Sequence, residues 1–148
     1  MQLLTYMLAA AVVGAMISIQ PPLNAILARG IGSAYWATAI SIGIAFVCIL
    51  AVVAVAGPGD MSIGTLKTVP VWVVFAGIVG AVFVLSGTVI APVTGGLVFF
   101  VCIVAGQLIG STIADHFGAF GLAVREISFA RLAGIVLVIV GAVLVGRG

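Results

Sequence analysis

Long apolar segments that are almost free of charge recur along the whole of this 148-residue chain. Hydrophobic residues make up 65% of it, charged residues only 5%, and the mean hydropathy is +1.53. Soluble domains carry roughly 25% charged residues, and an apolar run of about 20 residues is long enough to cross a bilayer as a helix. The sequence therefore predicts an integral membrane protein in contact with the lipid bilayer.

The apolar segments divide into five predicted membrane-spanning helices. Their approximate ranges are residues 3–28, 33–56, 70–90, 93–114 and 128–145. Gly57-Pro58-Gly59-Asp60 ends the second helix, and the polar stretch from there to Thr68 reads as a loop. The connecting stretches are too short to bury cores of their own. We therefore predict an all-α fold with a single transmembrane domain over residues 1–148.

Two adjacent prolines, Pro21 and Pro22, interrupt the first segment beside Gln20 and Asn24. Each proline lacks a backbone donor, so the helix is expected to bend and free carbonyls one turn earlier. These carbonyls, with Gln20 and Asn24, would form a local polar site. The alternative is a structural kink whose carbonyls are satisfied by neighbouring side chains.

Gln107, Ser111 and Asp115 follow one another at i, i+4 spacing in and after the fourth segment, and we call them the polar seam. Hydrocarbon offers no hydrogen-bond partners, so the seam must face other helices or a water-filled cavity. The alternative is packing, because Gly106 and Gly110 form a GxxxG step and Gln107 could bond a carbonyl of a neighbouring helix. Gly77 and Gly80 are likewise expected to be helix-packing positions.

The dense charge of the chain lies in the predicted loop from Asp115 to Ile127. Ser128 is placed to cap the fifth helix, with Arg131 one turn inside it. Arg131 either extends toward the lipid head groups or pairs with Asp115 across the loop.

Several function classes find no support in the residues. No nucleophile with a base, zinc motif or nucleotide-binding loop is present, so we predict neither an enzyme nor a bound metal or cofactor. The five Lys and Arg residues are scattered, which leaves no basic patch for nucleic acid.

The basic residues are nearly balanced between the two sides of the membrane. Five spans place Arg29 and Arg147 on the C-terminal side and Lys67, Arg125 and Arg131 on the N-terminal side. Since Lys/Arg asymmetry in short loops sets orientation, the chain is predicted to insert both ways, which is dual topology. Two oppositely inserted copies would supply the inverted repeat on which many transporters are built.

Helix rise adds a second argument for an antiparallel homodimer. At about 1.5 Å per residue, Gln20 of an inverted copy comes within about 5 Å of the depth of Gln107. Asn24 then approaches the depth of Asp115, whereas within one protomer the two pairs are predicted near opposite leaflets.

A set of short motifs extends over the whole chain in a specific order. They are Gln20-x-x-x-Asn24, Pro70-Val71-Trp72, Gly77-x-x-Gly80-Ala81, Gly106-Gln107, Asp115-His116-Phe117-Gly118, and Ile127-Ser128 followed by Arg131 and Gly134. In this order the chain resembles a short five-helix bacterial branch of the drug/metabolite transporter superfamily, the group known as domain of unknown function 606. The resemblance implies an inner-membrane, multi-pass transporter whose single-unit members pair antiparallel.

The resemblance has one informative departure. The related small multidrug exporters use a glutamate in the first helix, which this chain lacks, so drug export is not implied and the substrate stays open. We predict a transporter protomer that moves a small polar or amphipathic solute by alternating access across an antiparallel homodimer. The candidate substrate-binding residues are Gln20, Asn24, Gln107, Ser111 and Asp115. The alternative is a non-transporting membrane scaffold or accessory subunit.

Overall fold

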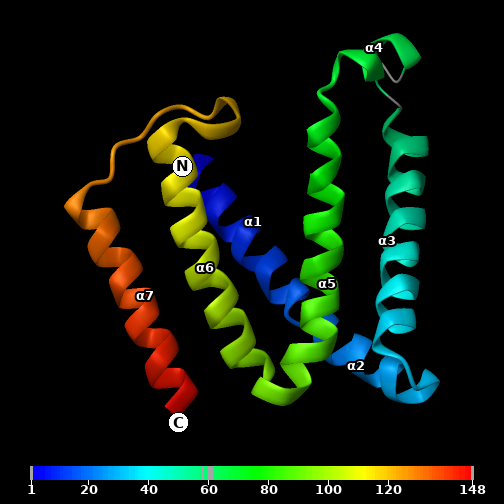
Figure 1. Ribbon diagram of the computed structural model, residues 1–148, viewed down its shortest axis with the longest axis horizontal. Coiled ribbons are helices and arrows are strands. Elements are labelled where there is room, and N and C mark those ends of the chain that lie inside the picture. The colour runs from blue at the N-terminus through cyan, green and yellow to red at the C-terminus, as the bar shows by residue number, and fades with distance from the viewer. Residues whose placement is uncertain (1, 58, 60–61, 148) are drawn as a thin grey trace. The chain divides into compact units, whose positions relative to one another are not determined.

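Helices account for the regular structure of the computed structural model, which describes residues 2–57, 59 and 62–147 (Figure 1). Five segments are long and apolar enough to cross a membrane, and no strand occurs in these ranges. The segments are Gln2–Ile31, Ala34–Ala56, Val71–Thr94, Gly96–Phe117 and Phe129–Arg147. The predicted all-α fold with five membrane-spanning helices is confirmed. The chain divides between Pro92 and Val93 into two compact units, described in turn below, and the single transmembrane domain stays a prediction.

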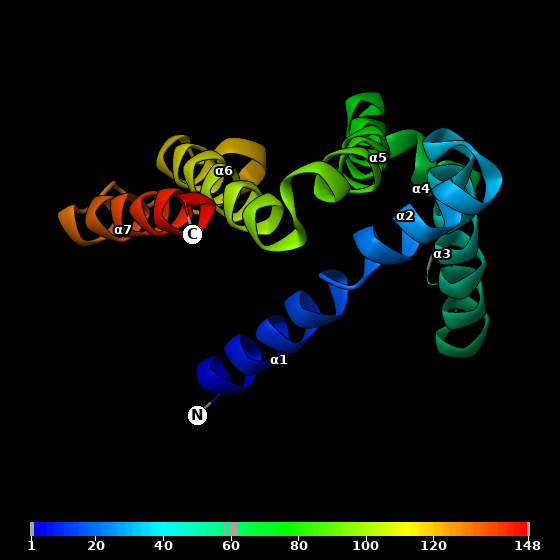
Figure 2. The same cartoon turned by 90° about the horizontal axis from the view of Figure 1, so that it is seen from below.

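The first span consists of two helices, α1 (Gln2–Ile17) and α2 (Gln20–Ile31), separated by Ser18 and Ile19. Figure 2 shows the break between them. Pro21 and Pro22 lie in the first turn of α2, where a missing N–H costs no intrahelical bond. The Ile19 amide donates to the Met16 carbonyl at 3.2 Å, which tightens the chain just before the break. The predicted bend is therefore a helix interruption that begins three residues before the first proline.

Helix α3 (Ala34–Ala56) runs back from α2 after a short turn at Gly32 and Ser33. Gly32 ends α2 in the left-handed conformation, and the Ser33 hydroxyl accepts the Trp36 amide at 3.3 Å to cap α3. The helix ends at Gly57, as expected from the glycine and proline that follow. Pro58 and Asp60 of that predicted breaker lie outside the described residues.

The segment predicted as a loop before Thr68 contains a short helix, α4 (Ile63–Thr68). It forms because the Ser62 hydroxyl accepts the Thr65 amide at 3.0 Å, a local cap that the loop assignment overlooked.

Pro70 lies in extended backbone ahead of the 3₁₀ turn η1 (Val71–Val74), and α5 (Phe75–Thr94) follows. Helix α5 continues through Pro92, four residues beyond its predicted end at residue 90.

The second unit consists of α6 (Gly96–Phe117), the turn η2 (Ala119–Gly121) and α7 (Phe129–Arg147). Helices α6 and α7 lie side by side and run in opposite directions (Figure 1). Asp115 and His116 belong to α6 rather than to the predicted loop, because the helix ends only at Gly118, with φ of 58°. The Ser128 hydroxyl accepts the Arg131 amide at 3.2 Å, which confirms the predicted cap of α7.

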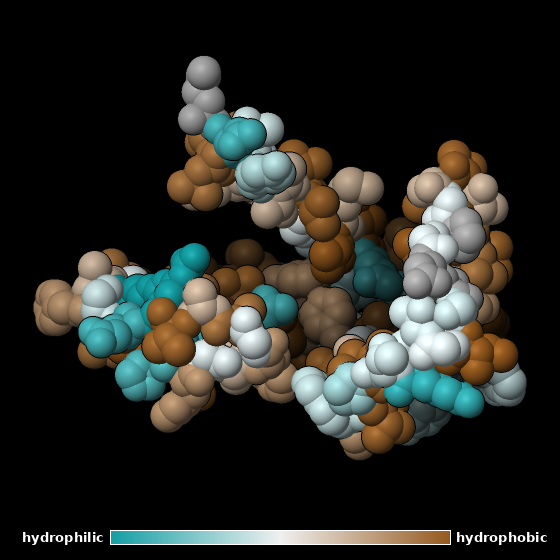
Figure 3. Space-filling model, turned by 90° about the horizontal axis from the view of Figure 1, so that it is seen from above, coloured by the Kyte–Doolittle hydropathy of each residue, from teal (hydrophilic) through white to brown (hydrophobic). Residues whose placement is uncertain are grey.

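Apolar side chains of the spans face outward. Among the described residues no large side chain is completely buried, and the buried hydrophobic residues are mostly small, with Phe99 as the exception. Figure 3 shows brown surface along much of the helices and hydrophilic surface at several places, including the segment between α6 and α7. This is the distribution expected when lipid, rather than a protein core, covers the helices.

Candidate functional site

The polar residues at the start of α2 differ in their hydrogen bonding. The Gln20 Nε2 atom donates to the Ser41 hydroxyl at 3.4 Å, which links α2 to α3. Asn24, one turn along α2, is only 6% exposed, and its Nδ2 atom has no hydrogen-bond partner among the described residues. A buried amide donor without a partner costs free energy. The structure thus gives Gln20 a structural bond and leaves Asn24 with unused hydrogen-bonding capacity.

A pair of threonines that the sequence analysis did not single out joins α3 to α5. The Thr38 Oγ1 atom donates to the Thr88 Oγ1 atom at 3.2 Å, and Thr88 in turn donates to the Val84 carbonyl at 2.9 Å. Thr38 and Thr88 are 6% and 3% exposed. The only signal in the sequence was a hydroxyl within each apolar span, and a hydroxyl can equally bond its own helix.

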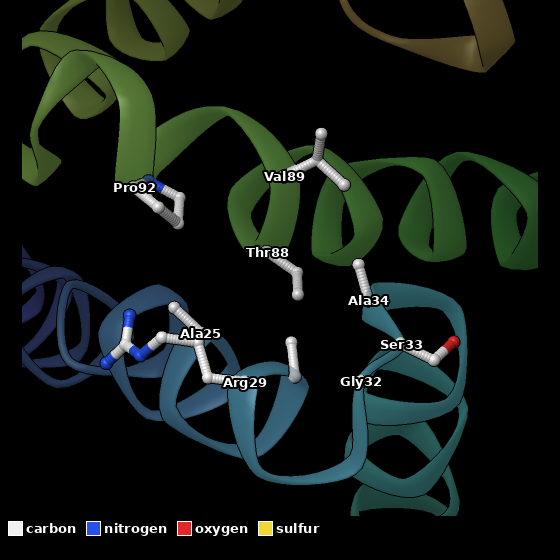
Figure 4. A pocket seen from close by; sticks show the side chains of 9 residues that line it. Ala25, Arg29, Gly32, Ser33, Ala34, Thr88, Val89 and Pro92 are labelled. Atoms are coloured by element: carbon white, nitrogen blue, oxygen red, sulfur yellow. The ribbon is translucent and has the colours of Figure 1, made fainter.

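A pocket of about 510 Å³ opens in the first unit between α2, the start of α3, and α5 (Figure 4). Small side chains form most of its α2 and α3 wall, which faces Thr88, Val89 and Pro92. Arg29 is the one charged residue in its lining. The complete lining is Ala25, Ala28, Arg29, Gly32, Ser33, Ala34, Thr88, Val89 and Pro92. Gln20 and Asn24 are absent from it, so the predicted site and this pocket are separate features.

The polar seam lies on α6 in the second unit, and its residues differ in what they contact. Gln107 is exposed at the middle of this 22-residue helix, and its side-chain amide makes no hydrogen bond to a described residue. The Ser111 hydroxyl donates to the Leu108 carbonyl of its own helix at 3.2 Å. Neither side chain forms a hydrogen bond with a neighbouring helix. The described residues therefore include no carbonyl that bonds the Gln107 amide, as its packing role would require.

The four glycines predicted as helix-packing positions have open space beside them. A Cβ atom built on Gly77, Gly80, Gly106 or Gly110 meets no heavy atom within 4 Å. Among the described residues, these glycines therefore have open space where a side chain would begin. Their role in helix packing stays a prediction.

Asp115, the last member of the seam, pairs with Arg131 of α7. The Asp115 Oδ2 atom lies 3.6 Å from the Arg131 Nη1 atom, and the two side chains are 29% and 33% exposed. Of the two alternatives for Arg131, the structure therefore shows pairing across the loop. The main chain supports the arrangement, since the Arg125 amide donates to the Asp115 carbonyl at 2.9 Å.

A groove of about 390 Å³ between α6 and α7 contains this ion pair. Its polar lining is Ser111, Thr112, Asp115 and Arg131, and its remaining lining is Leu108, Gly134, Ile135 and Val138. The structure thus brings Ser111 and Asp115 into one groove and adds Arg131, while Gln107 lies outside the lining. Such a lining can bind by hydrogen bonds, opposite charges and apolar contact. Among the described residues no cluster of three or more His, Cys, Asp or Glu side chains is placed to hold a metal ion.

Comparison with known protein families shows to which family the chain belongs. A family model described as "Putative inner membrane exporter, YdcZ" matches residues 5–144, nearly the whole sequence. The chain belongs to the YdcZ family. A search of curated proteins and a search of solved structures each found no match. Membership of the YdcZ family together with five apolar spans identifies a multi-pass inner-membrane protein with a transporter role, as predicted.

Proposed function

We propose that the chain is one protomer of an antiparallel homodimer that moves a small polar or amphipathic solute across the inner membrane by alternating access. The YdcZ family description supports transport, and its exporter wording favours outward movement. We also propose the placement in the drug/metabolite transporter superfamily, on the motifs quoted above. Gln20, Asn24, Gln107, Ser111 and Asp115 are the proposed solute-binding residues.

The observation that carries the proposal is the exposed amide of Gln107 at the middle of α6. A primary amide exposed to hydrocarbon would leave its donors and acceptor unsatisfied, at a cost of several kcal/mol. Because no described residue bonds the amide, we infer that water or solute supplies its hydrogen-bond partner. A water-filled cavity closed by a second copy supplies water or solute at that depth.

Inversion of the second copy is supported by depth and by charge. Gln107 lies about 16 Å along α6 from Gly96, close to half of the span, so turning the molecule over keeps it near the bilayer midplane. Solute sites of inverted-repeat transporters lie near that midplane. The near balance of Lys and Arg between the two sides favours insertion in both directions. The open faces at Gly80 and Gly106 give a second copy room for close helix contact.

Flux from liposomes tests the transport function. Purified protein is reconstituted into liposomes loaded with a mixture of small anions, cations, zwitterions and neutral polar solutes, and external solutes are identified by mass spectrometry. We expect selective, saturable release of one class compared with protein-free liposomes. Absence of any release, together with a stable complex with another membrane protein, would establish the scaffold alternative instead.

Orientation tests the dimer separately from transport. Fusions of the C-terminus to one reporter active only in the cytoplasm and one active only outside it should both give signal in a dual-topology protein. With the exposed Cys48 and Cys102 replaced by Ser, a Cys introduced near the middle of α6 should then crosslink two oppositely oriented copies. Signal from one reporter alone would rule out the antiparallel arrangement even if flux is observed.

A further inference from the structure

The ion pair between α6 and α7 has hydrogen-bonding capacity that the protein does not use. The separation of 3.6 Å between Asp115 Oδ2 and Arg131 Nη1 exceeds the length of about 2.8 Å typical of a charge-assisted hydrogen bond. The Nη1 atom is buried and has no hydrogen-bond partner among the described residues. The two charges are therefore held close together, but the guanidinium donor is still unsatisfied.

Charge balance limits what the groove can accept. One carboxylate and one guanidinium make its lining formally neutral. An anion that bound Arg131 alone would leave Asp115 without its partner, and a cation on Asp115 would leave Arg131 unpaired. Leaving one charge of a partly buried pair without compensation is costly. A ligand that carries both charges a few ångström apart satisfies both residues.

The rest of the groove indicates the remainder of such a ligand. Leu108, Ile135 and Val138 form an apolar wall beside the pair, and the hydroxyls of Ser111 and Thr112 add hydrogen-bonding atoms. A volume of about 390 Å³ falls within the range of roughly 300–1,000 Å³ typical of small-molecule sites. This lining fits a ligand in which an apolar group is attached to a small charged group.

We infer that this groove binds a zwitterion that joins a primary ammonium and an acidic group to an apolar body, with the acid on Arg131 and the ammonium on Asp115. The inference rests on the proposed function, since it names the solute class for the Ser111 and Asp115 part of the site. The same chemistry occurs in a free apolar amino acid and in the head group of phosphatidylethanolamine. The experiment separates these two sources.

Three probes that differ only in charge test the inference on the purified full-length protein. L-leucine carries both charges, 4-methylpentanoate lacks the ammonium, and 3-methylbutylamine lacks the carboxylate. Calorimetric titration in lipid-free detergent should show binding of L-leucine at least about tenfold tighter than either analogue, because each analogue leaves one charge of the pair unsatisfied. Native mass spectrometry after addition of phosphatidylethanolamine or phosphatidylglycerol measures whether the protein retains either lipid.

Variants with matched controls test whether Asp115 and Arg131 bind the zwitterion. Asp115→Asn and Arg131→Gln should each weaken the bound zwitterion at least about tenfold. Arg125→Gln and Glu126→Gln remove the same charges from exposed neighbours outside the groove and should leave binding unchanged. The comparison of probes on the unmodified protein holds even if a variant fails to fold.

Each outcome of these binding experiments either supports or overturns the zwitterion site. Preference for L-leucine supports a free zwitterion, and selective retention of phosphatidylethanolamine without L-leucine binding supports the head group. Equal binding of a one-charge analogue, or binding of none of the probes and neither lipid, overturns the inference. Because no flux is measured, these results stand apart from the liposome test, in which release of another solute class would uphold transport while the zwitterion fails.

Discussion

Thr38 of α3 donates a hydrogen bond to Thr88 of α5 across 3.2 Å, and both side chains are almost completely buried. The bond joins residues 50 positions apart in the sequence. In hydrocarbon a hydroxyl that loses such a partner has no water to replace it. The two threonines therefore hold together the helices that frame the pocket beside Arg29.

The first prediction concerns this pair. Thr88→Val keeps the shape of the side chain but removes the hydroxyl, so it should destabilise the protein by about 0.6 kcal/mol, the average for hydrogen bonds between membrane helices. Thermal unfolding in detergent measures the change. Ser86→Ala is the control, because Ser86 bonds only the Phe83 carbonyl of its own helix. Equal effects of the two variants would show that the bond between helices adds nothing.

The second prediction separates the two polar residues of α2. Asn24→Leu removes a buried donor that has no partner, so stability should be unchanged or raised, while flux in liposomes should fall at least about tenfold. Gln20→Leu breaks the bond to Ser41 and should lower stability by about 0.6 kcal/mol. A large loss of stability in Asn24→Leu with flux intact would give Asn24 a structural role.

The third prediction tests Gln107. Gln107→Leu should leave the thermal stability of the protomer unchanged, because no described residue bonds the amide, and should reduce flux at least about tenfold. Ile113→Leu, an apolar exchange at an exposed position of the same helix, is the control and should retain full flux. Normal flux and affinity in Gln107→Leu would show that the amide contacts neither solute nor cavity water.

The fourth prediction concerns the turn that follows the polar seam. Gly118 has φ of 58°, and a Cβ atom there would lie 2.8 Å from Val124 Cγ2 and 3.2 Å from the Leu122 carbonyl oxygen. Gly118→Ala should therefore cost more than the roughly 1–2 kcal/mol of a left-handed non-glycine residue alone. Gly121→Ala, with φ of 80° and open space around it, should cost only the conformational part. Thermal unfolding compares the two, and equal losses would mean that Val124 moves aside freely.

Much of the fold could be predicted because its main determinants are local. An apolar run long enough to cross the bilayer has to become a helix, since a helix satisfies its own backbone groups. The cap at Ser128 and the stop after Ala56 follow from residues adjacent in sequence. Helix ends were predicted less well, since α6 continues past Asp115 to Phe117 and α4 forms within a predicted loop.

The candidate site could be predicted only in part. The i, i+4 spacing of Gln107, Ser111 and Asp115 placed them on one face of a helix, and the structure has all three within α6. What each contacts did not follow from that spacing. Ser111 bonds its own helix, Gln107 bonds no described residue, and Asp115 pairs with Arg131.

The sequence by itself determined five apolar spans, a bend near Pro21 and Pro22, and the polar residues within the spans. Transfer into lipid and the missing proline amide depend on each residue and its neighbours. Only the tertiary structure decided that Arg131 meets Asp115, that Gln20 reaches Ser41, and that a groove lies between α6 and α7. Those contacts depend on how each helix is rotated and which face it turns to its neighbour, and that is a property of the packed helices together.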